Sequence, residues 1–411
     1  MFPLKKITQA DVAELRPIAE QVMRVDDTTF GATDEYAVRY RGQLTRDSVE
    51  AFHFVLERFR LLGYTPLFRK DQAGAHLLIA LRGVIDPPPS NPWVNGVMFL
   101  LTVASTLFFG GLYGYEGPFP EILQRAPEGF WENLQAFGAF LQIGASQMFN
   151  GWPFALSILA ILLAHEFGHY FAARYHKMHV TLPYFIPFPF GALGTMGAVI
   201  QLKSPPVNKR ALLDVGVAGP LAGFIVAVPL LIYGLATSEV NAVPVGQTTG
   251  FEGNSILYVL IKFLLFGRLL PEPTGGDWPA WLQTLWFYLS GIFPPNGGTD
   301  VFLNQVAWAG WGGLLVTGLN LIPAGQLDGG HALYVLIGRR ALRLVPIITG
   351  ALVLLGFFWP GWLVWAAIVF FLGRTHAEPL DQITELGPRR RALAVLALII
   401  FVLLITPVPI T

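Results

Sequence analysis

Cysteine is absent from this 411-residue chain. Its absence excludes disulfides, cysteine-ligated metal and a thiol nucleophile, so any bound metal must be held by His, Asp or Glu. Charge is also scarce, at 13% of residues against roughly 25% in soluble globular proteins, while 53% are hydrophobic. Basic and acidic residues number 27 each, so no net field attracts a polyanion. The composition excludes a wholly soluble, a disordered or a nucleic-acid-wrapping protein.

The charge that is present is concentrated near the N-terminus. Residues 1–86 hold 24 of the 54 charged side chains, and their opening is too polar for a signal peptide. We therefore expect a small soluble α/β domain at 1–86, without a catalytic cluster. Its expected helices lie near 8–24 and 46–62, and its expected strands near 36–44, 65–69 and 75–82. A stiff proline-rich linker at 86–92 leads out of it.

Residues 87–411 contain several apolar runs long enough to cross a bilayer, which takes about 20 residues as a helix. Uninterrupted runs lie near 92–113, 152–174, 211–236, 301–322 and 390–408. The run 344–373 is broken by Trp359–Trp362, which predicts two short spans joined by a hairpin. The expected fold is thus a polytopic α-helical membrane protein with about seven transmembrane helices. Two alternatives remain for the broken apolar stretch 253–293, namely interfacial helices or two further crossings.

Basic residues predict the orientation of the spans, because loops rich in Lys and Arg stay in the cytoplasm. They cluster in three loops: Arg174, Lys177, Lys203, Lys209 and Arg210; Arg339, Arg340 and Arg343; and Arg374 with Arg389–Arg391. The loop 114–133 instead carries four Glu and one Arg. We expect the N-terminal domain on the cytoplasmic side of a bacterial cytoplasmic membrane or the equivalent side of a plastid membrane.

The sequence His-Glu-Phe-Gly-His at 165–169 lies inside the second expected span. Residues four apart share one face of a helix, so His165 and His169 can hold one metal ion. Glu166 lies between them as a general base, and Zn²⁺ is the usual metal for this arrangement. Three ionisable groups within a span are costly, which favours a functional role over simple helix packing.

A catalytic zinc usually has three protein ligands and one open position. The candidates for the third ligand at membrane ends are Asp328, His331, His376, Glu378 and Asp381. The first two follow a span that runs in the same direction as that of His165, after a loop broken by proline and glycine. Asp328 is favoured, and His331 remains open. His176 and His179 lie too far along the helix, His176 by about 16 Å, and are expected at the membrane interface.

The segment Pro187–Leu202 is apolar but too rich in Gly and Pro for a spanning helix. It suits a re-entrant β-hairpin whose free edge pairs with an extended substrate. A plain interfacial loop is the alternative. Glycines 219 and 223, four apart within a span, are expected to let two helices pack closely.

Four of these patterns together resemble the site-2 protease family of intramembrane zinc metalloproteases. They are His-Glu-Phe-Gly-His at 165–169, Ala-Gly-Pro-Leu-Ala-Gly at 218–223, Asn320, and Leu-Asp-Gly at 327–329. The charged N-terminal domain, the Gly-Gln-Leu-Asp-Gly-Gly-His run and the polar segment near 374–381 are similar to the cyanobacterial and chloroplast branch. The short loops after 174 and 236 leave little room for the PDZ-like insert that some members carry.

The resemblance implies one Zn²⁺ per chain, held by His165, His169 and Asp328. It implies that Glu166 is the general base and that Asn320 donates a hydrogen bond to the substrate carbonyl or oxyanion. The expected function is an intramembrane zinc endopeptidase. Its partners would be the bilayer and a membrane-protein substrate with an unwindable transmembrane segment, with no nucleic acid. The alternative is a metal transporter or metal-sensing channel that uses the same ligands, with Asp214 as the main further candidate.

Overall fold

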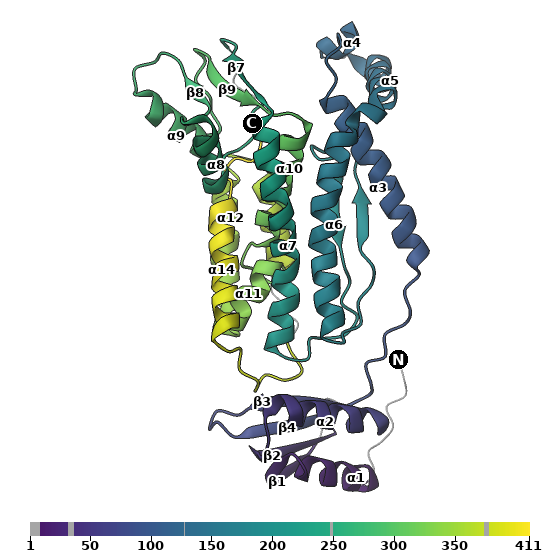
Figure 1. Ribbon diagram of the computed structural model, residues 1–411. Coiled ribbons are helices and arrows are strands. Elements are labelled where there is room, and N and C mark those ends of the chain that lie inside the picture. The colour runs from purple at the N-terminus through teal and green to yellow at the C-terminus, as the bar shows by residue number, and fades with distance from the viewer. Residues whose placement is uncertain (1–8, 32–36, 127, 247–249, 374–377) are drawn as a thin grey trace.

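The computed structural model describes residues 9–31, 37–126, 128–246, 250–373 and 378–411, and all structural statements below refer to these. A bundle of long helices stands on a small α/β head, and short strands and helices cover the opposite end (Figure 1). We call that opposite end the distal cap. It contains β7 (Glu239–Val243), α8 (Ile256–Phe266), β8 (Glu272–Pro273), α9 (Ala280–Ser290) and β9 (Gly298–Phe302).

The head is a four-stranded antiparallel sheet with two helices, in the strand order β1-β2-β4-β3. Its elements are α1 (Gln9–Glu20), β1 (Met23–Phe30), β2 (Val38–Leu44), α2 (Ser48–Leu61), β3 (Tyr64–Lys70) and β4 (His76–Arg82). Asp47 starts α2 by accepting hydrogen bonds from the amides of Val49 and Glu50. The core includes Phe52 and Phe68, which are fully buried.

One strand of the head differs from the sequence prediction. The predicted first helix ends at Glu20 rather than near residue 24, and β1 follows it. β1 is an edge strand that pairs with β2 alone in the described sheet, with a bulge between Val25 and Asp27. An edge strand buries few side chains on either face. The polar residues of β1 therefore interrupt the alternation of apolar and polar residues by which strands are recognised.

A segment from the C-terminal half adds to the head sheet. The Phe68 amide donates to the Leu380 carbonyl over 2.9 Å, and the Gln382 amide donates to the Phe68 carbonyl over 3.1 Å. On its other side, the same segment pairs with Pro206 and Val207, directly before α7 (Lys209–Ala236). A continuous ladder therefore joins the head to the start of a membrane helix.

Within the described residues, three stretches are helical, long and apolar enough to cross a membrane: Pro92–Tyr113, Gly129–Tyr175 and Lys209–Ala236. They contain α3 (Pro92–Tyr113), α5 (Gly129–Gln147), the 3₁₀ turn Met148–Gly151, α6 (Trp152–Tyr175) and α7. The short helix α4 (Glu121–Gln124) precedes α5. The second stretch begins well before the predicted residue 152, because the apolar helix α5 precedes the turn.

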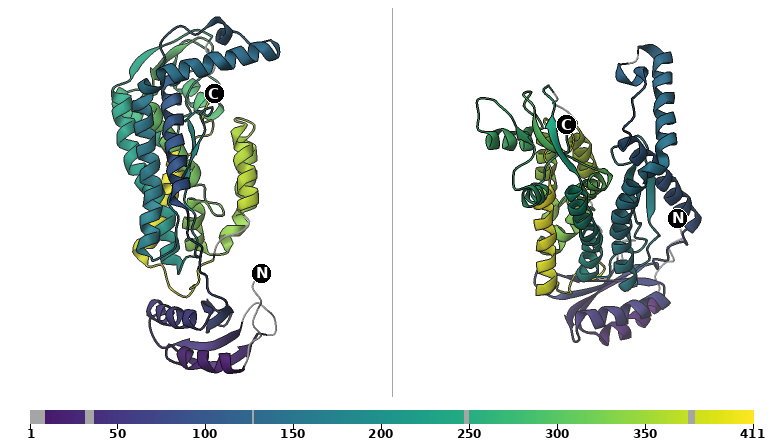
Figure 2. Two further views of the ribbon diagram at one scale, coloured as in Figure 1. Left: turned by 90° about the vertical axis from the view of Figure 1, so that its right-hand side faces the viewer. Right: turned by 45° about the horizontal axis from the view of Figure 1, so that its top comes forward.

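The remaining expected spans form shorter helices, so the number of seven crossings stays a prediction. They are α10 (Gln305–Asn320), α12 (Arg340–Leu355), α13 (Gly361–Leu372) and α14 (Pro388–Leu404). The fourth run was expected from 301, but its start belongs to β9, and Asn304 caps α10 by accepting from the Ala307 amide. The predicted helical hairpin of 344–373 is present as α12 and α13, and stands at the edge of the bundle (Figure 2, yellow-green).

The stretch 253–293 forms α8 and α9, each of 11 residues. At 1.5 Å per residue, each helix is about 16 Å long, roughly half of the hydrocarbon core. Both lie in the distal cap beside β7–β9 (Figure 1). Of the two alternatives, their length favours short interfacial helices over further crossings.

Candidate metal centre

Helix α6 brings three ionisable side chains into the protein interior. His165, Glu166 and His169 are 2%, 4% and 6% exposed. The two imidazole rings lie one helical turn apart, with centroids separated by 4.9 Å and Nε2 atoms by 3.2 Å. The helical spacing predicted from the sequence therefore produces a pair of histidines that face the same point.

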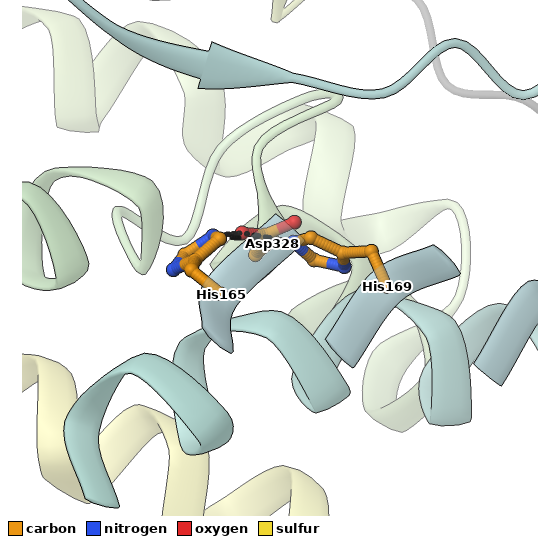
Figure 3. Close-up of side chains that lie close together, drawn as sticks. All are labelled: His165, His169 and Asp328. Atoms are coloured by element: carbon orange, nitrogen blue, oxygen red, sulfur yellow. Dashed lines mark hydrogen bonds and ion pairs between the residues drawn. The ribbon is translucent and has the colours of Figure 1, made fainter. Parts of the chain in front are cut away.

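Asp328 reaches this point from another helix. It is the first residue of α11 (Asp328–Ile337), which follows the loop after α10. Gly325 in that loop has a φ of +56°, and a Cβ on it would lie 2.3 Å from the Gly373 Cα, so only glycine fits this turn. The carboxylate lies 3.4 Å from His165 Nε2 and 3.3 Å from His169 Nε2 (Figure 3).

The separations between these three ligand atoms fit a zinc ion. Zinc binds His nitrogen and carboxylate oxygen at about 2.0–2.2 Å in a tetrahedron, which places neighbouring ligand atoms about 3.3–3.6 Å apart. The observed separations are 3.2, 3.3 and 3.4 Å. Two imidazoles and one carboxylate also leave the fourth tetrahedral position open. His165, His169 and Asp328 could therefore hold a catalytic zinc ion.

A cavity of about 720 Å³ opens onto these side chains. Glu166 and Asn320 line it together with the three candidate ligands. One wall is the extended chain 198–206, which continues from β6 (Thr195–Val199). β6 pairs with β5 (Tyr184–Pro187) in an antiparallel hairpin. A hairpin was expected within 187–202, and its first strand lies earlier, at 184–187; its re-entrant position stays a prediction. In the described residues, β5 is the only strand partner of β6.

Comparison with known proteins identifies the family. Residues 153–358 match the description "Peptidase family M50", which covers half of the chain. The chain belongs to this family. The resemblance to site-2 proteases seen in the sequence is therefore confirmed, and the expected class of zinc metallopeptidase is confirmed at the level of the family.

Several relatives among curated proteins are chloroplast proteins of plants. A probable zinc metalloprotease EGY1 of Oryza sativa subsp. japonica is 31% identical over 79% of this chain and 52% of its own length. EGY1 of Arabidopsis thaliana is 29% identical, over 82% and 58% respectively, and EGY2 of the same plant is 30% identical, over 75% and 50%. The chain thus spans about half the length of these relatives. No solved structure matches it significantly.

In this M50 chain, the backbone of helix α7 lies close to both ring nitrogens of His169. The Val215 carbonyl lies 2.7 Å from His169 Nδ1 and accepts a hydrogen bond from it, which leaves Nε2 free as a metal ligand. A Cβ on Gly219 would lie 2.1 Å from His169 Nε2. The sequence predicted only helix packing for Gly219, whereas the structure shows that it also leaves room for Nε2 of His169. Its place in the Ala-Gly-Pro-Leu-Ala-Gly pattern was the available signal.

Asn320, predicted to act on the substrate, is the last residue of α10. Its Nδ2 lies 3.4 Å from His165 Nε2, so the structure places its side chain at the candidate metal centre. His331, the open alternative for the third ligand, lies one turn beyond Asp328 and lines the cavity, but it is not part of the ligand cluster.

The other candidates lie elsewhere or outside the described residues. His376 is outside them. Glu378 binds Arg339 at 2.6 Å, and this hydrogen bond holds the pKa of Glu378 below its usual value. Asp381 is fully buried in the ladder that joins the head to α7, and burial raises its pKa. Neither carboxylate belongs to the candidate metal cluster.

Proposed function

We propose that this protein is an intramembrane zinc endopeptidase that hydrolyses peptide bonds within or near transmembrane segments of membrane-protein substrates. The observation that carries the proposal is the convergence of the Asp328 carboxylate on His165 and His169, at zinc-like separations, within an apolar helix bundle. The family membership and the names of the relatives support the same chemistry.

The roles of the residues follow from their positions. His165, His169 and Asp328 hold the metal, one ion per chain. The chemistry that a bound zinc ion supplies is Lewis acidity, which polarises a peptide carbonyl and makes water a nucleophile near neutral pH. Glu166, which lines the cavity, takes the proton of the attacking water and returns it to the leaving nitrogen. The Asn320 amide donates a hydrogen bond to the oxygen of the scissile carbonyl.

The wall of the cavity indicates how a substrate is presented. A membrane helix hides its carbonyls in internal hydrogen bonds, so it must become extended before attack. The outer edge of β6 and the chain 198–206 offer backbone groups beside Glu166, to which an extended segment can add as a further strand. The substrate we propose is therefore a membrane protein whose transmembrane segment unwinds locally. The unwound segment pairs with the edge of the β5–β6 hairpin, which we propose to be re-entrant.

The topology we propose has seven crossings. They are formed by α3, α6, α7, α10, α12, α13 and α14. The basic loops place the head and the metal-facing cavity at the cytoplasmic side, or at the equivalent side of a plastid membrane. The names of the chloroplast relatives support the plastid membrane of these two alternatives. In this topology, the lipid bilayer contacts the apolar outer surface of the helices. We propose no nucleic-acid partner.

The test is cleavage of a fluorescent transmembrane substrate by the purified protein in liposomes, with the zinc content measured in parallel. We expect Glu166→Gln to abolish cleavage while about one zinc ion per chain remains bound. Glu121→Gln, an exposed acid in α4, is the matched control and should cleave normally. A fully active Glu166→Gln variant would exclude the proposal.

The same liposomes also test the alternative of a metal transporter. A transporter would need a further acidic group on the path of the metal, and Asp214 is the main candidate for it. Asp214 is instead bound to Arg390 and His176. Uptake of zinc into the liposomes without peptide cleavage would favour the transporter.

A further inference from the structure

Three polar side chains that the proposed chemistry does not use meet at the head-proximal ends of three helices. Asp214 of α7 accepts two hydrogen bonds from Arg390 of α14, from Nε at 2.8 Å and from Nη2 at 2.7 Å. His176, which caps the C-terminal end of α6, lies 2.9 Å from the same carboxylate through Nε2. The side chains are 22%, 36% and 17% exposed, in the order Asp214, Arg390, His176. We call these three residues the Asp214 clamp.

The clamp is bidentate, which distinguishes it from an ordinary surface ion pair. A guanidinium that donates two hydrogen bonds to one carboxylate holds a defined orientation as well as a charge. The partial burial of all three groups also limits screening by solvent. The clamp therefore fixes how α6, α7 and α14 lie against one another at this end of the bundle.

Asp214 of the clamp is the sequence neighbour of a residue that contacts the candidate ligand His169. Asp214 precedes Val215, whose carbonyl accepts the hydrogen bond from His169 Nδ1. One turn further along α7, Gly219 packs against the other nitrogen of the same ring. His176 continues the helix that carries His169. A shift of α7 against α6 would therefore change the contacts of both ring nitrogens together.

We propose that Asp214 is a positioning residue for the zinc centre. With Arg390 and His176 it fixes the register of α7 against α6, so that the Val215 carbonyl holds His169 with its Nε2 aimed at the metal. This inference rests on the proposed function, since it concerns the same metal. Groups that orient a metal-bound histidine typically change metal affinity by about 10–100-fold when they are removed.

The experiment measures zinc affinity by competition with a chelator and records the visible spectrum of the Co²⁺-substituted protein. We expect Asp214→Asn and Arg390→Ala to weaken zinc binding by about 10-fold or more and to alter the Co²⁺ bands. Arg390→Lys keeps the charge and one donor, and should recover part of the affinity. With zinc saturating, kcat should fall while KM for the substrate stays near the wild-type value, because the clamp lies outside the cavity lining.

Arg389→Ala and Arg391→Ala are the matched controls. Both arginines are exposed on the same turn of α14 and contribute the same charge to the topology of the last span. These variants should keep wild-type zinc affinity and the wild-type Co²⁺ spectrum. If they lose affinity as Arg390→Ala does, the effect is one of general charge and the positioning role is wrong.

A folded Asp214→Asn protein with unchanged zinc affinity and Co²⁺ spectrum would overturn the inference. If this variant does not accumulate as folded protein, Arg390→Gln replaces it, and unchanged affinity in that variant has the same meaning. Failure of the wild-type protein to bind zinc would instead reject the proposed function. The two failures are therefore distinguishable.

Discussion

Two buried polar clusters lie at different levels of this charge-poor protein. At the candidate metal centre, His165, His169 and Asp328 direct three ligand atoms at one point beside a cavity. In the distal cap, the Tyr258 hydroxyl donates to Glu252 Oε1 at 2.8 Å, and Lys262 Nζ lies 3.8 Å from the same oxygen.

The two clusters differ in how their charge is compensated. In the distal cap, the Lys262 ammonium opposes the Glu252 carboxylate and lies 4.4 Å from the Tyr258 ring, so the cluster supplies its own counter-charge. At the metal centre, Lys203 is the only Lys or Arg among the residues that line the described cavity, and its ammonium donates to the Pro88 carbonyl. The zinc ion that we propose would supply the missing counter-charge. Burial of polar groups alone therefore does not indicate a metal site, whereas convergent ligand atoms that no Lys or Arg pairs with in the described residues do indicate one.

The largest effect expected from this comparison is the loss of the third ligand. Asp328→Ala leaves two histidines and removes the only carboxylate of the candidate cluster. We expect zinc content to fall from about one ion per chain to a small fraction of that, with loss of cleavage. Metal analysis of the purified protein checks this. His331→Ala, one turn along α11, is the control and should retain zinc; equal loss in both variants would contradict the assignment of Asp328.

The internal counter-charge of the distal cap can be removed as well. Lys262 is fully buried, so Lys262→Met leaves the Glu252 carboxylate without a cation. We expect a loss of stability of at most about 3–5 kcal/mol, because the buried Glu252 carboxylate must then stay unpaired or take up a proton. Thermal unfolding in detergent measures the change, and zinc content should not respond. The double variant Lys262→Met/Glu252→Gln should recover part of the stability; no recovery would show that packing dominates.

The close approach of α7 to His169 makes a smaller and more local prediction. Gly219→Ala introduces a Cβ 2.1 Å from His169 Nε2. The ring must move, and we expect zinc affinity to fall by about 10–100-fold. Gly223→Ala on the same helix places its Cβ at 3.2 Å from the Cβ of His165 and should have a weaker effect. Chelator competition compares the two, and equal affinities would show that α7 yields at this position.

The smallest expected effect is a dependence of the distal cap on pH. Burial raises the pKa of Asp300 in β9 to about 7, and burial also raises the pKa of Glu252. In the unfolded chain, the pKa of Asp is about 3.9. The folded state therefore binds more protons between these values, and stability falls as pH rises from about 4 to about 7. Thermal unfolding at pH 5 and pH 8 checks the sign, and Asp300→Asn should flatten the dependence.

The sequence predicted those parts of the fold that strong periodic patterns determine. The runs at 92–113 and 211–236 became α3 and α7 with nearly the expected bounds, because long apolar stretches leave little choice but a helix. β1 was missed, since its few buried positions do not alternate clearly. α5 was also missed, because aromatic and polar residues are mixed along it.

The candidate site shows the same division. His165 and His169 could be paired from the sequence because helical spacing alone brings them together. Asp328, 159 positions after His169, could be favoured over His331 only through loop breaks and resemblance. The roles of Gly219 and Val215 could not be predicted, because they depend on how closely α7 approaches α6.

The amino-acid sequence by itself determined the class of the molecule, the apolar helices, the pair of histidines on one helix face and the family. These properties follow from composition and local spacing, which need no partner. The tertiary structure alone decided that α11 brings Asp328 to both histidines, that residues 380–382 extend the head sheet, and that Asp214, His176 and Arg390 meet. These contacts join residues far apart in the chain, and only the packing of the helices sets the distances between them.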